Sequence, residues 1–177
     1  HTHHTVTTIV NIPNMNNITT TIIEKMIQYF GTDVRRINHA LKVYGFARCI
    51  ARKEKLTENE LFIVDIVAIL HDIGIIEAEK KYNSSNGKYQ EIEGPAIAKN
   101  MLSDQHIDTT TIDRICFIIG NHHSYQKIDN MDFQVIVEAD FLVNIYEDEM
   151  EKHSIENIRN KYFKTQTGIA IIQSMYA

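Results

Sequence analysis

Six side chains in four stretches of the chain could bind a metal ion. They are His39, the pair His71 and Asp72, the pair His122 and His123, and Asp140. Imidazole and carboxylate ligands together suit Mn, Fe, Co, Ni or Zn, and a site rich in imidazole disfavours Ca and Mg, although Mg is possible. We therefore expect one or two divalent ions, whose chemistry would be the activation of water as a nucleophile.

The first of these histidines lies in a pattern that predicts a helix over about residues 33–55. His39 begins a stripe of apolar residues at steps of four, three and four, and these are Val43, Phe46 and Ile50. Such spacing places all four side chains on one face of a helix. We expect His39 to share a buried face with its apolar neighbours.

A second helix is predicted to run directly into His71 and Asp72. The segment 61–70 is apolar nearly all round, which is typical of a central helix, and Thr57 is placed to open a capping box before it. It is too short and too interrupted by charge to cross a membrane. Gly74 is the expected left-handed end of this helix.

His122 and Asp140 extend two further apolar stripes. The stripe before His122 consists of Ile112, Ile115 and Ile119, and the stripe around Asp140 consists of Ile136, Val137 and Val143. These patterns predict helices from an Asp108 cap to about Gly120 and over about 132–147. Four separate helices would then each bring a metal-capable side chain to an apolar interior, where a shared cation lowers the cost of burial.

Each residue also has a structural interpretation when it is taken alone. His39 could be a hydrogen-bonded core histidine, and Asp72 could end a helix. His122 and His123 could form an exposed turn, and Asp140 could be the buried partner of an arginine. The ordered combination of all four stretches favours the metal site.

This order of motifs resembles the HD-domain metal-dependent phosphohydrolase superfamily over about residues 36–144. The motifs read INHALKVYGFAR around His39, VAILHDIGI around His71, IIGNHHSY around the histidine pair, and VEADFLVN around Asp140. The resemblance implies a helical bundle in which His39, His71, Asp72 and Asp140 hold one divalent ion. It also implies that Asp72, His122 and His123 could hold a second.

Two departures from the superfamily pattern concern residues around the expected site. Where relatives often have a histidine shortly before a helix-opening glycine, this chain reads EIEGPA, so Glu91 or Glu93 would replace that ligand. Ile75 stands where many relatives carry a lysine after HDIG, so another cation would have to hold a phosphate. The candidates for substrate binding are Arg36, Lys81, Lys88 and Lys127.

The resemblance predicts hydrolysis of a phosphate ester of a nucleotide or a similar small phosphorylated metabolite. Asp72 would bridge the ions and orient the nucleophile, and Glu91, Glu93 or one of the paired histidines could protonate the leaving group. Two alternatives stay open at this point, a non-catalytic module that senses a nucleotide and, with less support, a di-iron oxygenase.

Composition agrees with one globular domain. The chain has 177 residues, 44% of them hydrophobic, and a net charge of -5, so we expect no polymeric nucleic acid as a partner. Cys49 and Cys116 each lie in an apolar helical pattern typical of buried free thiols, which favours a cytoplasmic location, and we expect no membrane association. The sequence leaves the oligomeric state open.

The predicted fold class is all-α, a single helical bundle of about six to eight helices over residues 18–177, with a motif-bearing core at about 32–148. Residues 1–17 are expected to be an irregular leader that could include added sequence. The segment 79–90 is expected to be a solvated loop that could act as a lid. Gly94 and Pro95 are expected to open the helix that follows it.

Overall fold

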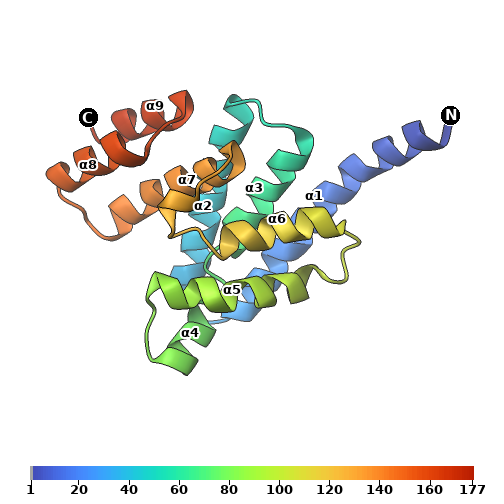
Figure 1. The fold of residues 1–177 in the computed structure, drawn as a ribbon, viewed down its shortest axis with the longest axis horizontal. Helices are drawn as coiled ribbons and strands as arrows, with labels where there is room; N and C mark the ends of the chain where they lie inside the picture. Colours follow the sequence, from blue (N-terminus) through green and yellow to red (C-terminus); the bar gives the residue numbers. More distant parts are fainter. Residues whose placement is uncertain (1) are drawn as a thin grey trace.

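The computed structural model describes the backbone of residues 2–177 and the side chains of residues 15–177, and it is all-helical (Figure 1). Its described part contains nine α-helices and one short 3-10 helix, slightly more than the sequence predicts. The helices are α1 (Thr2–Phe30), α2 (Val34–Lys53), α3 (Glu58–Leu70), α4 (Ile75–Tyr82), α5 (Gly87–Leu102), α6 (Thr109–Ile119), η1 (Tyr125–Lys127), α7 (Met131–Glu147), α8 (Lys152–Tyr162) and α9 (Gln166–Met175).

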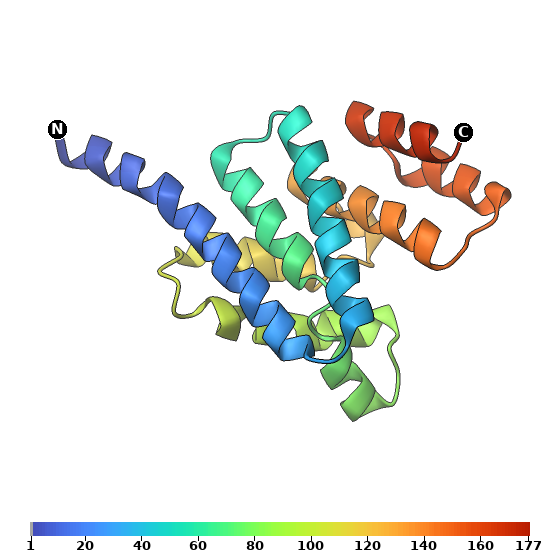
Figure 2. The ribbon, with the colours of Figure 1, turned by 180° about the vertical axis from the view of Figure 1, so that it is seen from behind.

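Helix α3 forms the centre of the bundle, as its continuous apolar sequence predicts. Its residues from Phe62 to Leu70 are all buried. Helices α1, α2, α6 and α7 pack against it. Figure 2 shows α1 and α2 beside α3 on the back of the molecule. A helix surrounded in this way holds the residues at its end, His71 and Asp72, at the middle of the fold.

Local sequence signals fix several of the helix ends. Thr57 accepts a hydrogen bond from the Glu60 amide, and the Glu60 carboxylate accepts one from the Thr57 amide, which confirms the capping box before α3. The Asp108 side chain accepts from the Thr111 amide at the start of α6. Gly31 ends α1 with a φ of 59°, a conformation that favours glycine.

The amino-terminal region differs from the prediction. Helix α1 begins at Thr2, so the backbone of residues 2–17 is helical instead of an irregular leader. The residue before α2 is Asp33, whose side chain makes no capping hydrogen bond. Polar Asn and Thr residues have modest helix propensity, and this composition does not prevent a helix from forming.

The region of the predicted lid also differs, because helices extend into it from both sides. Only residues 83–86 separate α4 from α5, and Asn83 ends α4 in the left-handed conformation. Pro95 lies inside α5 and does not open it. The Asn86 side chain accepts from the Lys88 amide and caps α5 earlier than predicted.

Gly74, expected to end one helix, and Gly94, expected to open another, both have a packing role. Gly74 has a φ of -80°, so it is not a left-handed stop. A Cβ atom on Gly74 would lie 2.6 Å from both the Gln90 carbonyl oxygen and the Gly94 amide nitrogen. The absence of side chains therefore allows α5 to pack directly against the turn that follows His71 and Asp72.

The two cysteines differ from the prediction of buried thiols. Cys49 is exposed and Cys116 is half-buried, and both are free. Within the part of the chain that the structure describes, no helix combines the length and apolar character needed to span a membrane.

Candidate metal centre

Three residues from three helices form the first group of candidate ligands. His39 comes from α2, His71 follows the last residue of α3, and Asp140 lies in the middle of α7. The His39 Nε2 atom lies 3.1 Å from His71 Nε2 and 3.1 Å from Asp140 Oδ1, and His71 Nε2 lies 3.4 Å from the same Asp140 oxygen. All three side chains are buried, so the atoms converge on one small polar space in the core.

A second group lies beside the first and consists of Asp72, His122 and His123. Each offers a ligand atom within 4.8 Å of the others. His122 and His123 occupy the turn after α6, and His122 Nε2 lies 3.3 Å from Asp72 Oδ1. The ring centroids of His71 and His122 are 5.3 Å apart, so the two groups adjoin.

Asp72 connects the two groups through its two carboxylate oxygens. Its Oδ2 atom faces the first group, 3.3 Å from His39 Nε2 and 3.4 Å from His71 Nε2. Its Oδ1 atom faces His122 in the second group. A carboxylate with one oxygen toward each group is arranged to bridge two cations.

The other ring nitrogens of three histidines are occupied in a way that suits metal binding. The Nδ1 atoms of His71 and His122 lie 2.8 and 2.7 Å from the carbonyl oxygens of Ala68 and Ile119. The Nδ1 atom of each histidine therefore donates the hydrogen bond, since a carbonyl only accepts, and the Nε2 lone pair is left to face the centre.

For His39, the hydrogen bond at Nδ1 is made by Glu147, a residue that the sequence analysis did not identify. Its Oε1 atom lies 2.8 Å from His39 Nδ1, and its Oε2 atom lies 2.6 Å from Lys42 Nζ. Glu147 is seven residues after Asp140, and this spacing places the two side chains on the same face of α7. That spacing is the signal that could have identified it.

Without a cation, the carboxylates of the centre attract protons to the histidines. Burial alone would lower the pKa of His39, but hydrogen bonds to Asp140 and Asp72 outweigh it and raise the pKa to about 11. Burial works against ionisation of Asp140, yet the neighbouring His71 and His39 hold the pKa of its carboxyl well below the usual value. The centre is thus built to hold positive charge next to its carboxylates.

The surroundings of His123 indicate whether a cation fits the second group. Its Nε2 atom is buried and has no hydrogen-bond partner, which is costly for a polar atom. Burial, together with the neighbouring His122, lowers the pKa of His123 to about 4, so this ring is a neutral imidazole. A neutral, unpartnered imidazole nitrogen beside a carboxylate is a ready metal ligand, so the residues fit a divalent ion.

The structure brings neither Glu91 nor Glu93 into a ligand group. Glu91 accepts hydrogen bonds from the His123 amide at 3.1 Å and from the Ser124 hydroxyl, so it holds the turn that carries the histidine pair. Glu93 accepts from Lys81 at 2.7 Å and from the Tyr82 hydroxyl, and the bond from Lys81 lowers its pKa. Glu93 is therefore paired with Lys81 and lies outside both ligand groups.

Most of the candidate cations for substrate binding already have partners. Arg36 pairs with Asp33 and Glu79, and Lys81 pairs with Glu93. The Lys88 ammonium lies 4.9 Å from the centroid of the Tyr89 ring. Lys127 is exposed at the end of η1, shortly after the histidine pair, and makes no ion pair with the described residues.

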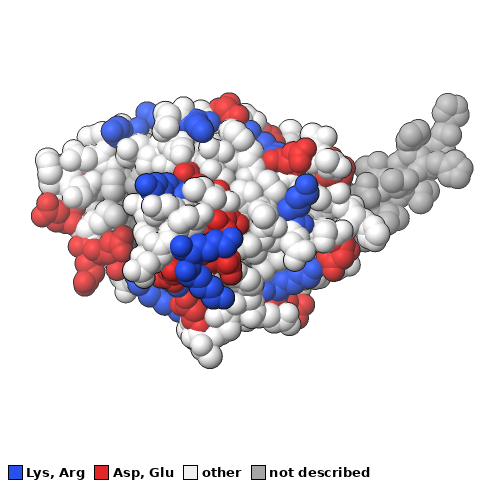
Figure 3. Space-filling model, turned by 60° about the horizontal axis from the view of Figure 1, so that its bottom comes forward, with Lys and Arg blue, Asp and Glu red and all other residues white. Residues whose placement is uncertain are grey.

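Charges of both signs mix on the face that includes α4 and α5. Figure 3 shows Lys and Arg side chains among Asp and Glu there. No large basic surface is visible on this face.

Tyr125 lies at the edge of the centre and was also missed. It follows His123 by two residues, and its ring centroid is 5.3 Å from that of Phe141, the neighbour of Asp140. Burial and the nearby Asp140 carboxylate raise the pKa of Tyr125 to about 12, so its hydroxyl stays protonated. A protonated hydroxyl here could donate a hydrogen bond to a substrate.

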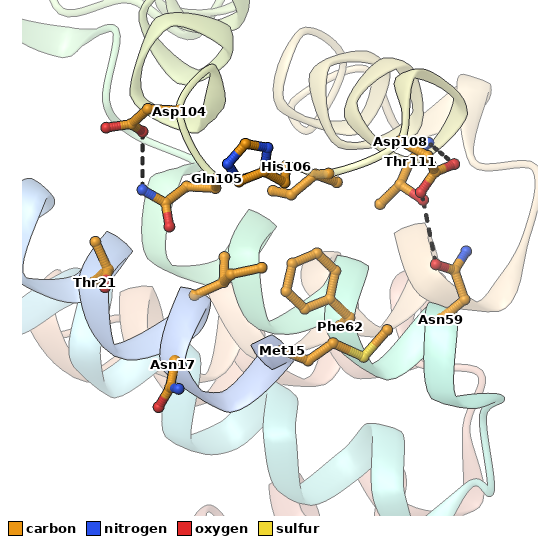
Figure 4. Close-up of a pocket in the computed structure, with 12 residues that line it drawn as sticks. Met15, Asn17, Thr21, Asn59, Phe62, Asp104, Gln105, His106, Asp108 and Thr111 are labelled. Carbon is orange, nitrogen blue, oxygen red and sulfur yellow. Dashed lines mark hydrogen bonds between the residues drawn. The ribbon is translucent and has the colours of Figure 1, made fainter. Parts of the chain in front are cut away.

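A separate cavity of about 480 Å³ lies on another part of the molecule, between α1, α3 and the loop that leads into α6 (Figure 4). It contains none of the candidate metal ligands. Its acidic residues already have partners, because Asp104 pairs with Lys25 and Asp108 accepts from Thr111. We therefore assign the chemistry to the buried His and Asp groups.

The arrangement agrees with a family model for the HD domain, which matches residues 36–160. The chain belongs to the HD domain family. The match includes every residue of the two ligand groups. It begins inside the expected core of about 32–148 and extends beyond the carboxyl end of that core. It assigns the chain in general terms to the metal-dependent HD hydrolases, which bind divalent metal ions.

Comparison with solved structures supports the same fold. The chain is similar to the crystal structure of a predicted HD superfamily hydrolase from an uncultured Thermotogales bacterium, with a TM-score of 0.63 and 20% sequence identity. The match covers 91% of this chain and 84% of that chain. No curated protein matches the sequence.

Proposed function

We propose that this HD-domain protein hydrolyses a phosphate ester of a nucleotide or a similar small phosphorylated metabolite, using two divalent ions. The observation that carries the proposal is the position of Asp72, with one carboxylate oxygen toward His39 and His71 and the other toward His122. Paired ions about 3.5–4 Å apart are a recurrent arrangement in enzymes that hydrolyse phosphate esters.

The divalent ions would supply a Lewis acid that polarises the phosphoryl group and makes water more acidic. His39, His71 and Asp140 would hold one ion, and His122 and His123 would hold the other, with Asp72 shared. The hydrogen bonds at the Nδ1 atoms of His39, His71 and His122 keep the imidazoles in a fixed orientation. Glu91 keeps the histidine turn in place through the His123 amide.

The substrate would approach from the side of Asp72. Its side chain is 20% exposed, whereas that of His71 is 0% exposed and that of His122 is 1% exposed. Tyr125 and Lys127 lie on η1, two and four residues after His123. We propose that Lys127 attracts the phosphate and that the protonated Tyr125 hydroxyl donates a hydrogen bond to it.

The direct test is a phosphate-release screen over a panel of nucleotides and small phosphate esters with Mn, Co, Ni, Fe or Mg. The wild-type chain is compared with Asp72→Ala and with the matched control Asp113→Ala, which changes an exposed aspartate on α6. We expect Asp72→Ala to lower turnover by about 100-fold or more, since it removes the shared ligand, and Asp113→Ala to retain it.

Other outcomes separate the competing interpretations. Equal and slow phosphate release by wild type and Asp72→Ala would contradict hydrolysis. Saturable nucleotide binding without turnover would favour the sensing module. Oxygen consumption together with the spectrum of a coupled iron pair would favour the di-iron oxygenase.

A further inference from the structure

Two buried side-chain atoms among the described residues lack a hydrogen-bond partner, and they belong to Gln90 and His123. The Gln90 residue is only 7% exposed, and the atom without a partner is its Oε1. Buried polar groups are nearly always satisfied, so an exception is a sign of a missing partner. The partner of His123 Nε2 is accounted for by the proposed second ion, whereas Gln90 Oε1 has not been explained.

The orientation of the Gln90 amide follows from its other end. The Nε2 atom of Gln90 donates a hydrogen bond of 2.7 Å to the Ser85 carbonyl oxygen. A carbonyl cannot donate, so the nitrogen must be the atom on that side. The unpartnered atom is therefore a carbonyl oxygen, which is an acceptor and a metal ligand but not a donor.

Gln90 lies on the face of α5 that covers the second ligand group. Gly87, three residues earlier, lies so close to His123 that a Cβ atom would be 2.7 Å from Cδ2 of its ring. Glu91, the next residue, accepts from the His123 amide. Positions 87, 90 and 91 share one side of a helix, so Gln90 belongs to the face that contacts His123.

The backbone of Gln90 is close to the other half of the same group. Its carbonyl oxygen lies 2.6 Å from the position that a Cβ atom on Gly74 would occupy, and Gly74 follows Asp72 by two residues. Gln90 is therefore placed between the turn that carries Asp72 and the turn that carries His123. The missing partner of its side chain would lie in this narrow region.

We propose that the Gln90 side-chain oxygen is a ligand of the ion held by Asp72, His122 and His123. This inference rests on the proposed two-ion centre. A neutral amide oxygen adds no negative charge, so the two carboxylates Asp72 and Asp140 leave part of the charge of two divalent ions uncompensated. That remaining positive charge favours a dianionic phosphate as the substrate.

The same ligand set makes the two ion sites unequal. Each ion would have two histidine ligands, so the sites differ in their oxygen ligands. The first ion would have the Asp140 carboxylate and one oxygen of Asp72. The second would have the other oxygen of Asp72 and the neutral amide oxygen of Gln90. Because fewer charged ligands surround it, the second ion binds more weakly. The added oxygen also suits Mn²⁺, which accepts oxygen ligands readily.

The test is a titration of the metal-free full chain with Co²⁺, followed by calorimetry and by the visible absorption of the ion. Wild type is compared with Gln90→Leu, Gln90→His and the control Gln105→Leu, which makes the same chemical change near the opposite end of α5. Binding at the first group and the thermal midpoint of each variant report whether it folds.

We expect wild type and Gln105→Leu to bind two ions, the second more weakly. Gln90→Leu should keep the first and weaken the second by about tenfold or more, and Gln90→His should tighten the second because imidazole is a stronger ligand for Co²⁺. The absorption of the second ion should change in Gln90→His. These results would support the proposal.

A second-ion affinity in Gln90→Leu within about twofold of wild type, with the first site intact, would overturn it. Binding of only one ion by wild type would also overturn it. If Gln90→Leu or Gln105→Leu failed to fold, the proposal would be tested by comparing Gln90→His with wild type. An unchanged second-ion affinity and absorption in Gln90→His would then overturn the proposal. The titration measures no turnover, so it can fail while phosphate release still supports the proposed function.

Discussion

Two buried carboxylates on α7, Glu138 and Asp140, have very different surroundings although they are two residues apart. Glu138 is fully buried and accepts hydrogen bonds from the Gln134 amide group, the backbone amides of Lys164 and Thr165, and the Thr165 hydroxyl. Its donors are neutral and come mostly from the chain that leads into α9. Glu138 therefore fastens α9 to α7.

Asp140, in contrast, is surrounded by imidazoles. Its Oδ1 atom lies near the Nε2 atoms of His39 and His71, and the opposite nitrogens of those rings are bonded to Glu147 and to the Ala68 carbonyl. Glu138 is satisfied by neutral donors of the fold itself, whereas Asp140 faces the Nε2 atoms of two imidazoles, where a cation could take the place of a proton. The comparison shows that the donors around a buried carboxylate, and not burial alone, distinguish a structural role from metal binding.

The largest effects are expected when each carboxylate is removed. Glu138→Ala leaves several buried donors without an acceptor and should lower the free energy of unfolding by about 3 kcal/mol or more. Asp140→Ala should abolish ion binding at the first group while it lowers the free energy of unfolding of the metal-free chain by clearly less. Urea denaturation and metal titration measure the two quantities.

Glu138→Ala should mainly lose stability, and Asp140→Ala should mainly lose metal binding. This difference would be contradicted if Asp140→Ala retained wild-type affinity for metal. It would also be contradicted if Asp140→Ala destabilised the metal-free chain as much as Glu138→Ala does. The ions bound by folded Glu138→Ala, measured below its denaturation midpoint, serve as the control.

A smaller effect is expected at Glu147, which orients His39 from behind. Glu147→Gln should weaken metal binding at the first group by about 10–100-fold, because such supporting hydrogen bonds fix the ring and raise its basicity. Calorimetric titration measures this change. The matched variant Glu24→Gln, at an exposed position on α1, should bind metal as wild type does, and equal affinities in the two variants would refute the role of Glu147.

Gly168 packs against the Glu138 carboxylate, so a substitution there tests the structural role of Glu138 alone. A Cβ atom there would collide with Glu138 Oε1 and lie 2.8 Å from Thr165 Oγ1. Gly168→Ala should therefore cost about 1–3 kcal/mol of stability and leave metal binding unchanged. Gly45→Ala, which has open space in α2, should instead stabilise the chain by up to about 1 kcal/mol. Thermal or urea denaturation of both variants tests whether the sign differs.

The smallest expected effect is a release of protons when metal binds. Because the pKa of His39 is raised to about 11 in the metal-free protein, this ring is protonated at neutral pH, and a cation must displace the proton. Calorimetry in buffers of different ionisation enthalpy should show at least one proton released at the first group near pH 7–8, since the same carboxylates also raise the pKa of His71. The affinity should rise as the pH increases. Affinity independent of pH over this range would disagree with the geometry.

The sequence predicted the elements that carry the ligands better than the connections between them. The apolar stripes around His39, His122 and Asp140 reported burial, and the caps at Thr57 and Asp108 fixed helix starts, because these signals are local. Gly74 and Gly94 were misinterpreted because a glycine that permits close packing resembles, in sequence, one that ends or opens a helix.

Residues that support the site were harder to predict. The seven-residue spacing from Asp140 could have placed Glu147 on the same face of α7. Its partner His39 is 108 positions away, so the contact itself is visible only once α2 and α7 are packed together. Gln90 was overlooked in favour of Glu91 and Glu93, because charge was taken as the sign of a ligand. The structure shows that those two glutamates already bond to the His123 amide and to Lys81.

The proposed function depends on Asp72 as a bridge between two cations held by the two ligand groups. Anomalous scattering from crystals of the full chain grown with Mn²⁺ tests it directly, since it locates the ions without reference to activity. We expect two peaks about 3.5–4 Å apart, one on each side of the Asp72 carboxylate. A single peak, or peaks that Asp72 does not contact, would contradict it.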